Sequence, residues 1–153
     1  MNYRNFFFGI IFSFLIFGIV NAVENKILFK VNNEIITSFD IYNELKYLEV
    51  INEKFKNIEK KQAFEIAKRS LIREKIKEIE LQKVLKELKI EDRILDNILI
   101  NYFKKIQIKS TFDLKTYFTS INIDPNLIRK KITIEILWNE FIFDKYNQSV
   151  KIN

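Results

Sequence analysis

The stretch that decides the fold is ILFKVNNEIITSFDIYNEL, which runs from Ile27 to Leu45. Its first part is apolar and β-branched at its ends, so a short strand is predicted over Ile27 to Val31. The Asn32-Asn33 pair favours a turn, because asparagine tolerates positive φ and can hydrogen-bond its own backbone. A brief return strand at Ile35-Ile36 would then complete a β-hairpin.

A helix is predicted to follow the hairpin directly. Thr37 is expected to cap this helix. Asp40, three residues later, can complete a capping box in which aspartate takes the place of the usual, longer glutamate. We expect the long helix to begin near Tyr42 and to fray around residues 54–57. Its apolar positions have the i, i+4, i+7 spacing of one helical face: Ile41, Leu45 and Leu48.

The rest of the chain is predicted to be helical, because it holds almost no glycine or proline. Gly9 and Gly18 lie near the N-terminus, and Pro125 is the single proline. Further helices are expected over about 60–89, 92–105, 110–118 and 125–147, each with a recognisable start signal or apolar spacing. Part of the last segment also alternates as a strand would, but the Asp124-Pro125 start and the length favour a helix.

The segment over 60–89 carries two apolar stripes rather than one. A helix with two apolar stripes must be covered from two directions, so we expect a central helix with charged residues in the gaps between the stripes. The two stripes consist of Phe64, Ala67 and Leu71, continued near Leu81, Leu85 and Leu88, and of Ile72, Ile76 and Ile79.

Residues 1–22 have the features of a secretory signal. Arg4 provides a positive n-region, the stretch from Phe6 to Val20 is uncharged and apolar, and a cut is predicted between Ala22 and Val23. The apolar stretch is short for a membrane-spanning helix, which needs roughly 20 apolar residues. We therefore expect a cleaved signal and a mature domain over 23–153, with an uncleaved anchor as the alternative.

Composition excludes several kinds of chemistry. The chain contains no histidine and no cysteine, which removes His-dependent triads, disulfides and most transition-metal sites. No glycine follows Gly18, so there is no Gly-rich phosphate loop. The formal net charge is +6, but opposite charges alternate along the predicted helices, as on a solvated surface. We expect no catalytic residue, no metal and no cofactor.

The motif VNNEIITSFDI (Val31 to Ile41), placed after a signal segment, resembles the start of the SurA N-terminal domain family of periplasmic chaperones. Three later stretches are similar to that family as well: SLIREKIKEIELQKVLKELKI (Ser70 to Ile90), KIEDRILDNIL (Lys89 to Leu99) and TFDLKTYFTSINIDPNLIRKKI (Thr111 to Ile132). Asn122 stands where the family favours a glycine in a loop. Members usually continue into parvulin-type prolyl isomerase domains, whose histidines have no counterpart here.

The resemblance implies a mainly α, multi-helix domain with a short N-terminal β-hairpin, located in the periplasm. It implies an ATP-independent chaperone that binds unfolded outer-membrane or other envelope polypeptides and has no enzymatic activity. A second copy or a partner chain is expected to complete an open apolar groove. The candidate client-binding side chains are the aromatic residues clustered late in the chain: Tyr102, Phe103, Phe112, Tyr117, Phe118, Trp138 and Phe141.

The residues alone leave two other classes of function open. The first is a structural or assembly adaptor, whose groove binds one dedicated partner such as a separately encoded prolyl isomerase. The second is a nucleic-acid binder, which the sequence pI of about 9.4 suggests. No basic cluster is interleaved with aromatic residues, and export argues against nucleic acid, so we expect none to be bound. An enzyme ranks last, because no acidic residues form a recognisable catalytic constellation.

Overall fold

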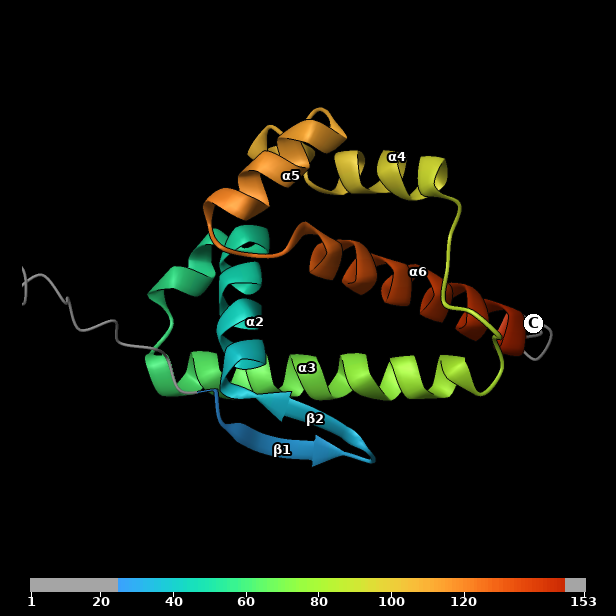
Figure 1. Cartoon of the computed structure of the whole chain (residues 1–153), viewed down its shortest axis with the longest axis horizontal. Helices are drawn as coiled ribbons and strands as arrows, with labels where there is room; N and C mark the ends of the chain where they lie inside the picture. The colour runs from blue at the N-terminus through green and yellow to red at the C-terminus, as the bar shows by residue number, and fades with distance from the viewer. Residues whose placement is uncertain (1–24, 148–153) are drawn as a thin grey trace, which may run out of the picture.

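A computed structural model describes residues 25–147, and the predicted signal segment with its cleavage site lies outside that range. The described part is mainly helical, with one two-stranded hairpin at its N-terminal end (Figure 1). The predicted class, a multi-helix chain with a short β-hairpin, is therefore confirmed. No helix within 25–147 combines the length and the apolar character needed to cross a membrane.

The hairpin consists of β1 (Ile27–Val31) and β2 (Glu34–Thr37), which pair antiparallel. Asn32 in the turn has φ 54°, in the left-handed region that asparagine tolerates better than most residues. The pairing shifts register between Ile27 and Phe29, where β1 contains a bulge or irregularity. The predicted Asn-Asn turn is confirmed, and the hairpin leads directly into the first described helix.

Helix α2 (Ser38–Ile51) begins with a complete capping box. The amide of Asp40 donates to the Thr37 hydroxyl over 3.3 Å, and the amide of Thr37 donates to the Asp40 carboxylate over 2.7 Å. These two bonds satisfy first-turn N–H groups, so the helix begins at Ser38, earlier than the expected start near Tyr42. The region expected to fray is a 3-10 helix, η1 (Glu53–Asn57), held by the buried Phe55.

Helix α3 (Lys60–Gln82) is central, as predicted, because α2 and β1 contact it and α6 also packs along it. The predicted end near residue 89 is wrong, since the chain turns after Gln82 and runs as turn and coil to residue 91. Val84 and Leu85 beyond that end are exposed. Packing supplies most of a helix's stability, and residues 82–87 are all exposed and therefore gain little from it.

The second half of the chain contains four more helical elements: α4 (Asp92–Tyr102), the 3-10 helix η2 (Lys104–Ile106), α5 (Thr111–Ser120) and α6 (Pro125–Asn147). Ser110 caps α5 by accepting from the amide of Asp113 over 3.1 Å, and Asp124 accepts from the amide of Asn126 over 2.9 Å. The helical interpretation of 125–147 is therefore confirmed. Asn122 has φ 56°, so it takes the turn conformation for which a glycine is usual.

Two apolar clusters form the core. The larger joins the α4, α5 and α6 layer to α2, and its buried members are Tyr47, Leu95, Leu99, Phe103, Ile108, Leu114, Phe118, Ile123, Ile128 and Ile132. The smaller lies where α2, α3 and the hairpin meet, and its buried members are Ile36, Ile41, Ala67 and Leu71. Of the second predicted stripe on α3, Ile72 packs against the smaller cluster but Ile76 is exposed. Helices α3 and α6 lie side by side and run in the same direction (Figure 1).

Candidate functional site

A hollow with a volume of about 490 Å³ opens between the C-terminal end of α3, the segment after it and the first half of α6. Leu85 and Leu88 supply its accessible apolar lining, whereas Ile134, which also borders it, is only 1% exposed. Charged and polar side chains surround them, and the full lining consists of Glu78, Gln82, Leu85, Lys86, Leu88, Lys130, Thr133 and Ile134.

A second hollow, of about 470 Å³, continues along the other half of α6. Its lining consists of Val84, Leu85, Leu137, Glu140, Phe141, Asp144 and Lys145. The two hollows share Leu85. Ile134, Leu137 and Phe141 also lie on one face of α6, because their spacing of three and four residues is that of helical neighbours. We call the two hollows together the α3–α6 groove.

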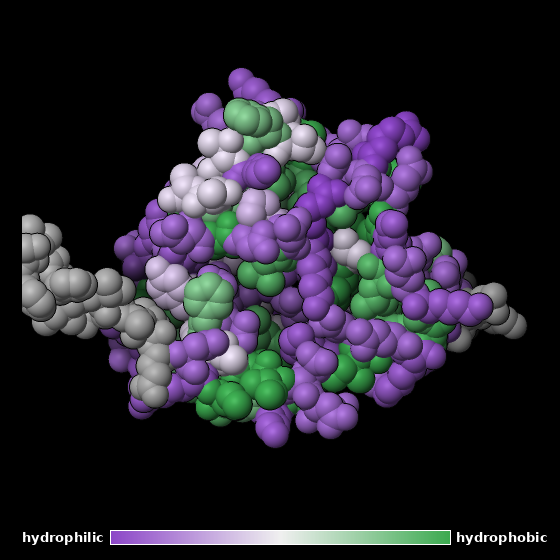
Figure 2. Space-filling model, in the orientation of Figure 1, coloured by the Kyte–Doolittle hydropathy of each residue, from purple (hydrophilic) through white to green (hydrophobic). Residues whose placement is uncertain are grey.

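The groove exists because α3 ends before α6 does. After Gln82 the chain crosses toward α4 without regular structure, so no helix covers this face of α6 in the described part. Val84 is 56% exposed as a result, and Leu85 is also exposed. Figure 2 shows apolar side chains at the surface over the ends of α3 and α6, beside charged ones. Apolar side chains that gather in a surface hollow mark an interaction site more often than scattered ones do.

Unpaired charges stand at both ends of the groove. Lys86 lines the first hollow, beside the first half of α6. Glu140 and Asp144 line the second hollow, beside the C-terminal half of α6. None of these three side chains forms an ion pair with another residue in the range 25–147. Their charges are therefore available to a molecule that enters the groove.

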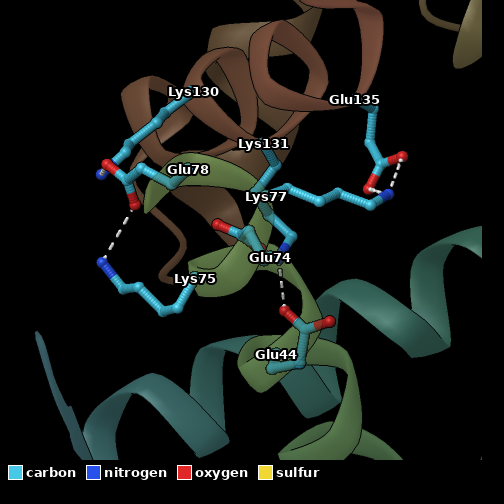
Figure 3. Close-up of polar contacts among 8 residues, drawn as sticks. All are labelled: Glu44, Glu74, Lys75, Lys77, Glu78, Lys130, Lys131 and Glu135. Atoms are coloured by element: carbon cyan, nitrogen blue, oxygen red, sulfur yellow. Dashed lines mark hydrogen bonds and ion pairs between the residues drawn. The ribbon is translucent and has the colours of Figure 1, made fainter. Parts of the chain in front are cut away.

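A buried ionic cluster fixes α6 in position beside the groove (Figure 3). Lys131 on α6 is only 6% exposed, and its ammonium donates to Glu44 on α2 over 2.6 Å and to Glu74 on α3. Burial by itself lowers the pKa of Lys131, but the attraction of the two carboxylates outweighs burial and leaves this pKa above its ordinary value. One cation thus joins three helices.

A second ionic chain runs from the hairpin to the groove. Lys75 on α3 donates to Glu34 over 3.0 Å. It also donates to Glu78 over 3.1 Å, and Glu78 pairs with Lys130 over 2.5 Å (Figure 3). Burial raises the pKa of Glu78, but Lys130 and Lys75 outweigh it and hold this pKa below its ordinary value. Lys77 and Glu135 add a further α3–α6 pair at 2.6 Å.

The structure divides the seven aromatic residues predicted from the sequence into three groups. Phe103 and Phe118 are buried in the larger core cluster, where their rings pack edge to face with centroids 5.1 Å apart. They support the fold and present almost no accessible surface, at 3% and 0% exposed. Phe112, 74% exposed, and Tyr102 lie on the surface. The three partly buried residues are Tyr117, Trp138 and Phe141, and of all seven only Phe141 lines the α3–α6 groove.

Sequence reasoning missed the aliphatic side of this site. The apolar spacing predicts a helix to residue 89 that contains Val84, Leu85 and Leu88. The sequence gives no clear signal for them, because Leu85 and Leu88 continue the apolar spacing of α3. The ionic pairs were also missed, because three helices far apart in sequence must meet before Lys131 can contact Glu44 and Glu74.

No group of three or more acidic side chains in the described range could hold a metal ion. Comparison of the chain with protein-family models, with curated proteins and with solved structures finds no match. The similarity to the SurA N-terminal domain family thus depends on the sequence motifs quoted above, and the α3–α6 groove offers apolar surface to which another molecule could bind.

Proposed function

We propose that this chain is an ATP-independent chaperone of the periplasm, which holds unfolded outer-membrane or other envelope polypeptides in the α3–α6 groove. The observation that carries the proposal is the apolar lining of the groove, in which the exposed Val84 and Leu85 and the partly buried Leu88 face Leu137 and Phe141 on α6. The predicted signal segment and the resemblance of Val31 to Ile41 to SurA-type chaperones support the location and the class.

The physical task of such a chaperone matches this kind of surface. Strands of outer-membrane barrels alternate apolar and polar residues, and before folding their apolar side chains have no partner. Transfer of apolar surface out of water contributes about 25 cal/mol per Å². A shallow apolar groove therefore gives weak, reversible binding without any covalent step or nucleotide.

The supports of the groove suit repeated binding and release. Lys131 on α6 pairs with Glu44 on α2 and Glu74 on α3, and Lys77 on α3 pairs with Glu135 on α6. These ion pairs hold one wall of the groove in place. A wall that is already ordered loses little conformational freedom when a client binds. The segment after Gln82 forms the opposite wall and leaves the groove accessible.

The test compares groove variants in a holding assay. An unfolded outer-membrane β-barrel is diluted from urea in the presence of equimolar purified chain, and its aggregation is followed by light scattering. We expect the unaltered chain to suppress aggregation and the double variant Val84→Ser, Leu85→Ser to lose most of that effect. Both positions are exposed, so the fold should tolerate the change. Ile94→Ser, at an exposed apolar position on α4, is the matched control.

Two outcomes would contradict the proposal. If the unaltered chain gives no suppression but binds tightly to one folded partner, the chain is an assembly adaptor. If Phe112→Ser abolishes suppression whereas the groove variants do not, clients bind the exposed aromatic surface of α5 instead. Circular dichroism of each variant establishes whether a loss of activity comes from a loss of fold.

A further inference from the structure

We propose that the α3–α6 groove selects polypeptide segments with an apolar centre and opposite charges at their two ends. This inference deepens the proposed function, on which it rests, by naming the chemistry of the preferred client. It is carried by the arrangement of charge along the groove, which differs between the two ends.

The end nearer α3 is positive. Two lysines, Lys86 and Lys130, line it together with one carboxylate, Glu78. That carboxylate is already shared between two ammonium groups, since Lys130 contacts one oxygen over 2.5 Å and Lys75 contacts the other over 3.1 Å. Glu78 therefore has little capacity left to bind a basic side chain of a client. Lys86 forms no ion pair within residues 25–147, so its ammonium can pair with an acidic side chain of a client.

The end nearer the C-terminus of α6 is negative. Glu140 and Asp144 line it, and neither has an ion-pair partner in the described structure. The one cation in this lining, Lys145, lies over aromatic rings, with its ammonium 5.4 Å from the centre of Phe141 and 5.6 Å from that of Tyr146. A basic side chain of a client would thus meet two carboxylates that form no ion pair within residues 25–147.

These two ends fix the length of the preferred segment. Lys130, which lines the same hollow as Lys86, and Asp144 lie at opposite ends of the groove face of α6, and a helical rise of 1.5 Å per residue places their Cα atoms roughly 21 Å apart. This distance approximates the length of the groove. An extended chain covers this distance with about six residues at about 3.3 Å each. A segment with an acidic residue, about five apolar or alternating residues and a basic residue therefore fits. Because an extended segment can lie in either direction, the order of the two charges matters less than their opposite signs.

The experiment uses three fluorescent peptides with the same five-residue apolar centre. Their flanking residues are Asp and Lys, Asp and Asp, or Lys and Lys. Fluorescence anisotropy at low salt measures their affinity for the full chain. We expect the Asp/Lys peptide to bind about two- to fivefold more tightly than either like-charged peptide, which is the effect of about one exposed ion pair. Added salt should reduce this preference, because exposed charges are screened.

A charge reversal then tests whether the groove is responsible. Lys86→Glu makes both ends negative, so the preference should move to the Lys/Lys peptide. Lys115→Glu on the exposed face of α5 changes the net charge equally but lies outside the groove, and it should leave the preference unchanged.

Equal affinities for the three peptides, or no binding of any of them, would overturn the selection by charge. The same holds if Lys115→Glu shifts the preference as much as Lys86→Glu does, since the cause would then be the overall charge of the protein. The holding assay with the unfolded barrel decides the proposed function separately, because it depends on apolar contact. Suppression of aggregation without a peptide preference would leave the chaperone proposal intact.

Discussion

Lys131 on α6 and Glu44 on α2 form an ion pair with 2.6 Å between nitrogen and oxygen, although the residues are only 6% and 2% exposed. The other oxygen of Glu44 has no hydrogen-bond partner in the range 25–147. A buried, incompletely bonded ion pair is often no more stabilising than apolar residues of the same volume. Its clear effect here is to fix the position of α6, and with it one wall of the α3–α6 groove.

The first prediction concerns removal of this cation. Lys131→Met should lower the free energy of unfolding by about 3–5 kcal/mol, because Glu44 and Glu74 would be left buried without a compensating charge. Urea denaturation followed by circular dichroism measures the loss. Lys130→Met is the matched control, since Lys130 is half-exposed and its partner Glu78 keeps the contact with Lys75. If the two variants lose equal unfolding free energy, the buried Lys131 ammonium does not have the stabilising role proposed for it.

The second prediction concerns alkaline pH. Burial, together with a hydrogen bond to Tyr102, raises the pKa of Tyr47, and the pKa of Lys131 is also raised. Above about pH 10 the unfolded chain therefore releases protons that the folded chain still holds, so stability is complete below that pH and falls as pH rises. The urea midpoint should decline from about pH 10 upward. Tyr47→Phe should make the decline shallower. An unchanged slope would show that ionisation of Tyr47 does not contribute to the loss of stability.

The local structure of the first half could largely be predicted from the sequence. Asn32 and Thr37 determine the hairpin turn and the helix cap through their own backbone and nearby side chains, so a short stretch of sequence contains the whole cause. The end of α3 could not be predicted in this way. Leu85 and Leu88 continue its apolar spacing, so the local pattern does not mark an end at Gln82.

The candidate site was harder to predict for a related reason. The aromatic residues predicted to bind clients include Phe103 and Phe118, which are buried in the core. Aromatic character alone does not separate the two roles, because it favours a core as much as a binding surface. The groove depends instead on Val84 and Leu85 lying opposite Phe141, more than fifty positions later in the chain. Such a pairing follows from the packing of α3 against α6, which no local pattern encodes.

The third prediction tests the cap of α2. Thr37→Ala removes the hydroxyl that accepts from the amide of Asp40, and it should cost about 1 kcal/mol of unfolding free energy. Ser110→Ala removes the corresponding acceptor at the start of α5 and should cost a similar amount. The double variant should lose the sum of the two, because the caps share no partner. A double variant that departs from the sum by more than about 0.5 kcal/mol would indicate coupling between the two helix starts.

The last prediction concerns the turn that leads into α6. Asn122 has φ 56°, a conformation that costs a residue with a bulky or branched side chain about 1–2 kcal/mol. Asn122→Val should therefore lower the free energy of unfolding by about that amount, whereas Asn122→Gly should change it by less than about 1 kcal/mol, since glycine adopts positive φ readily. Asn97→Val, at an exposed position within α4, controls for the substitution itself, because asparagine and valine have similar helix propensities. If Asn122→Val is as stable as the control in urea denaturation, the left-handed conformation at this turn is not what the fold requires, and another path of the chain into α6 must be accessible.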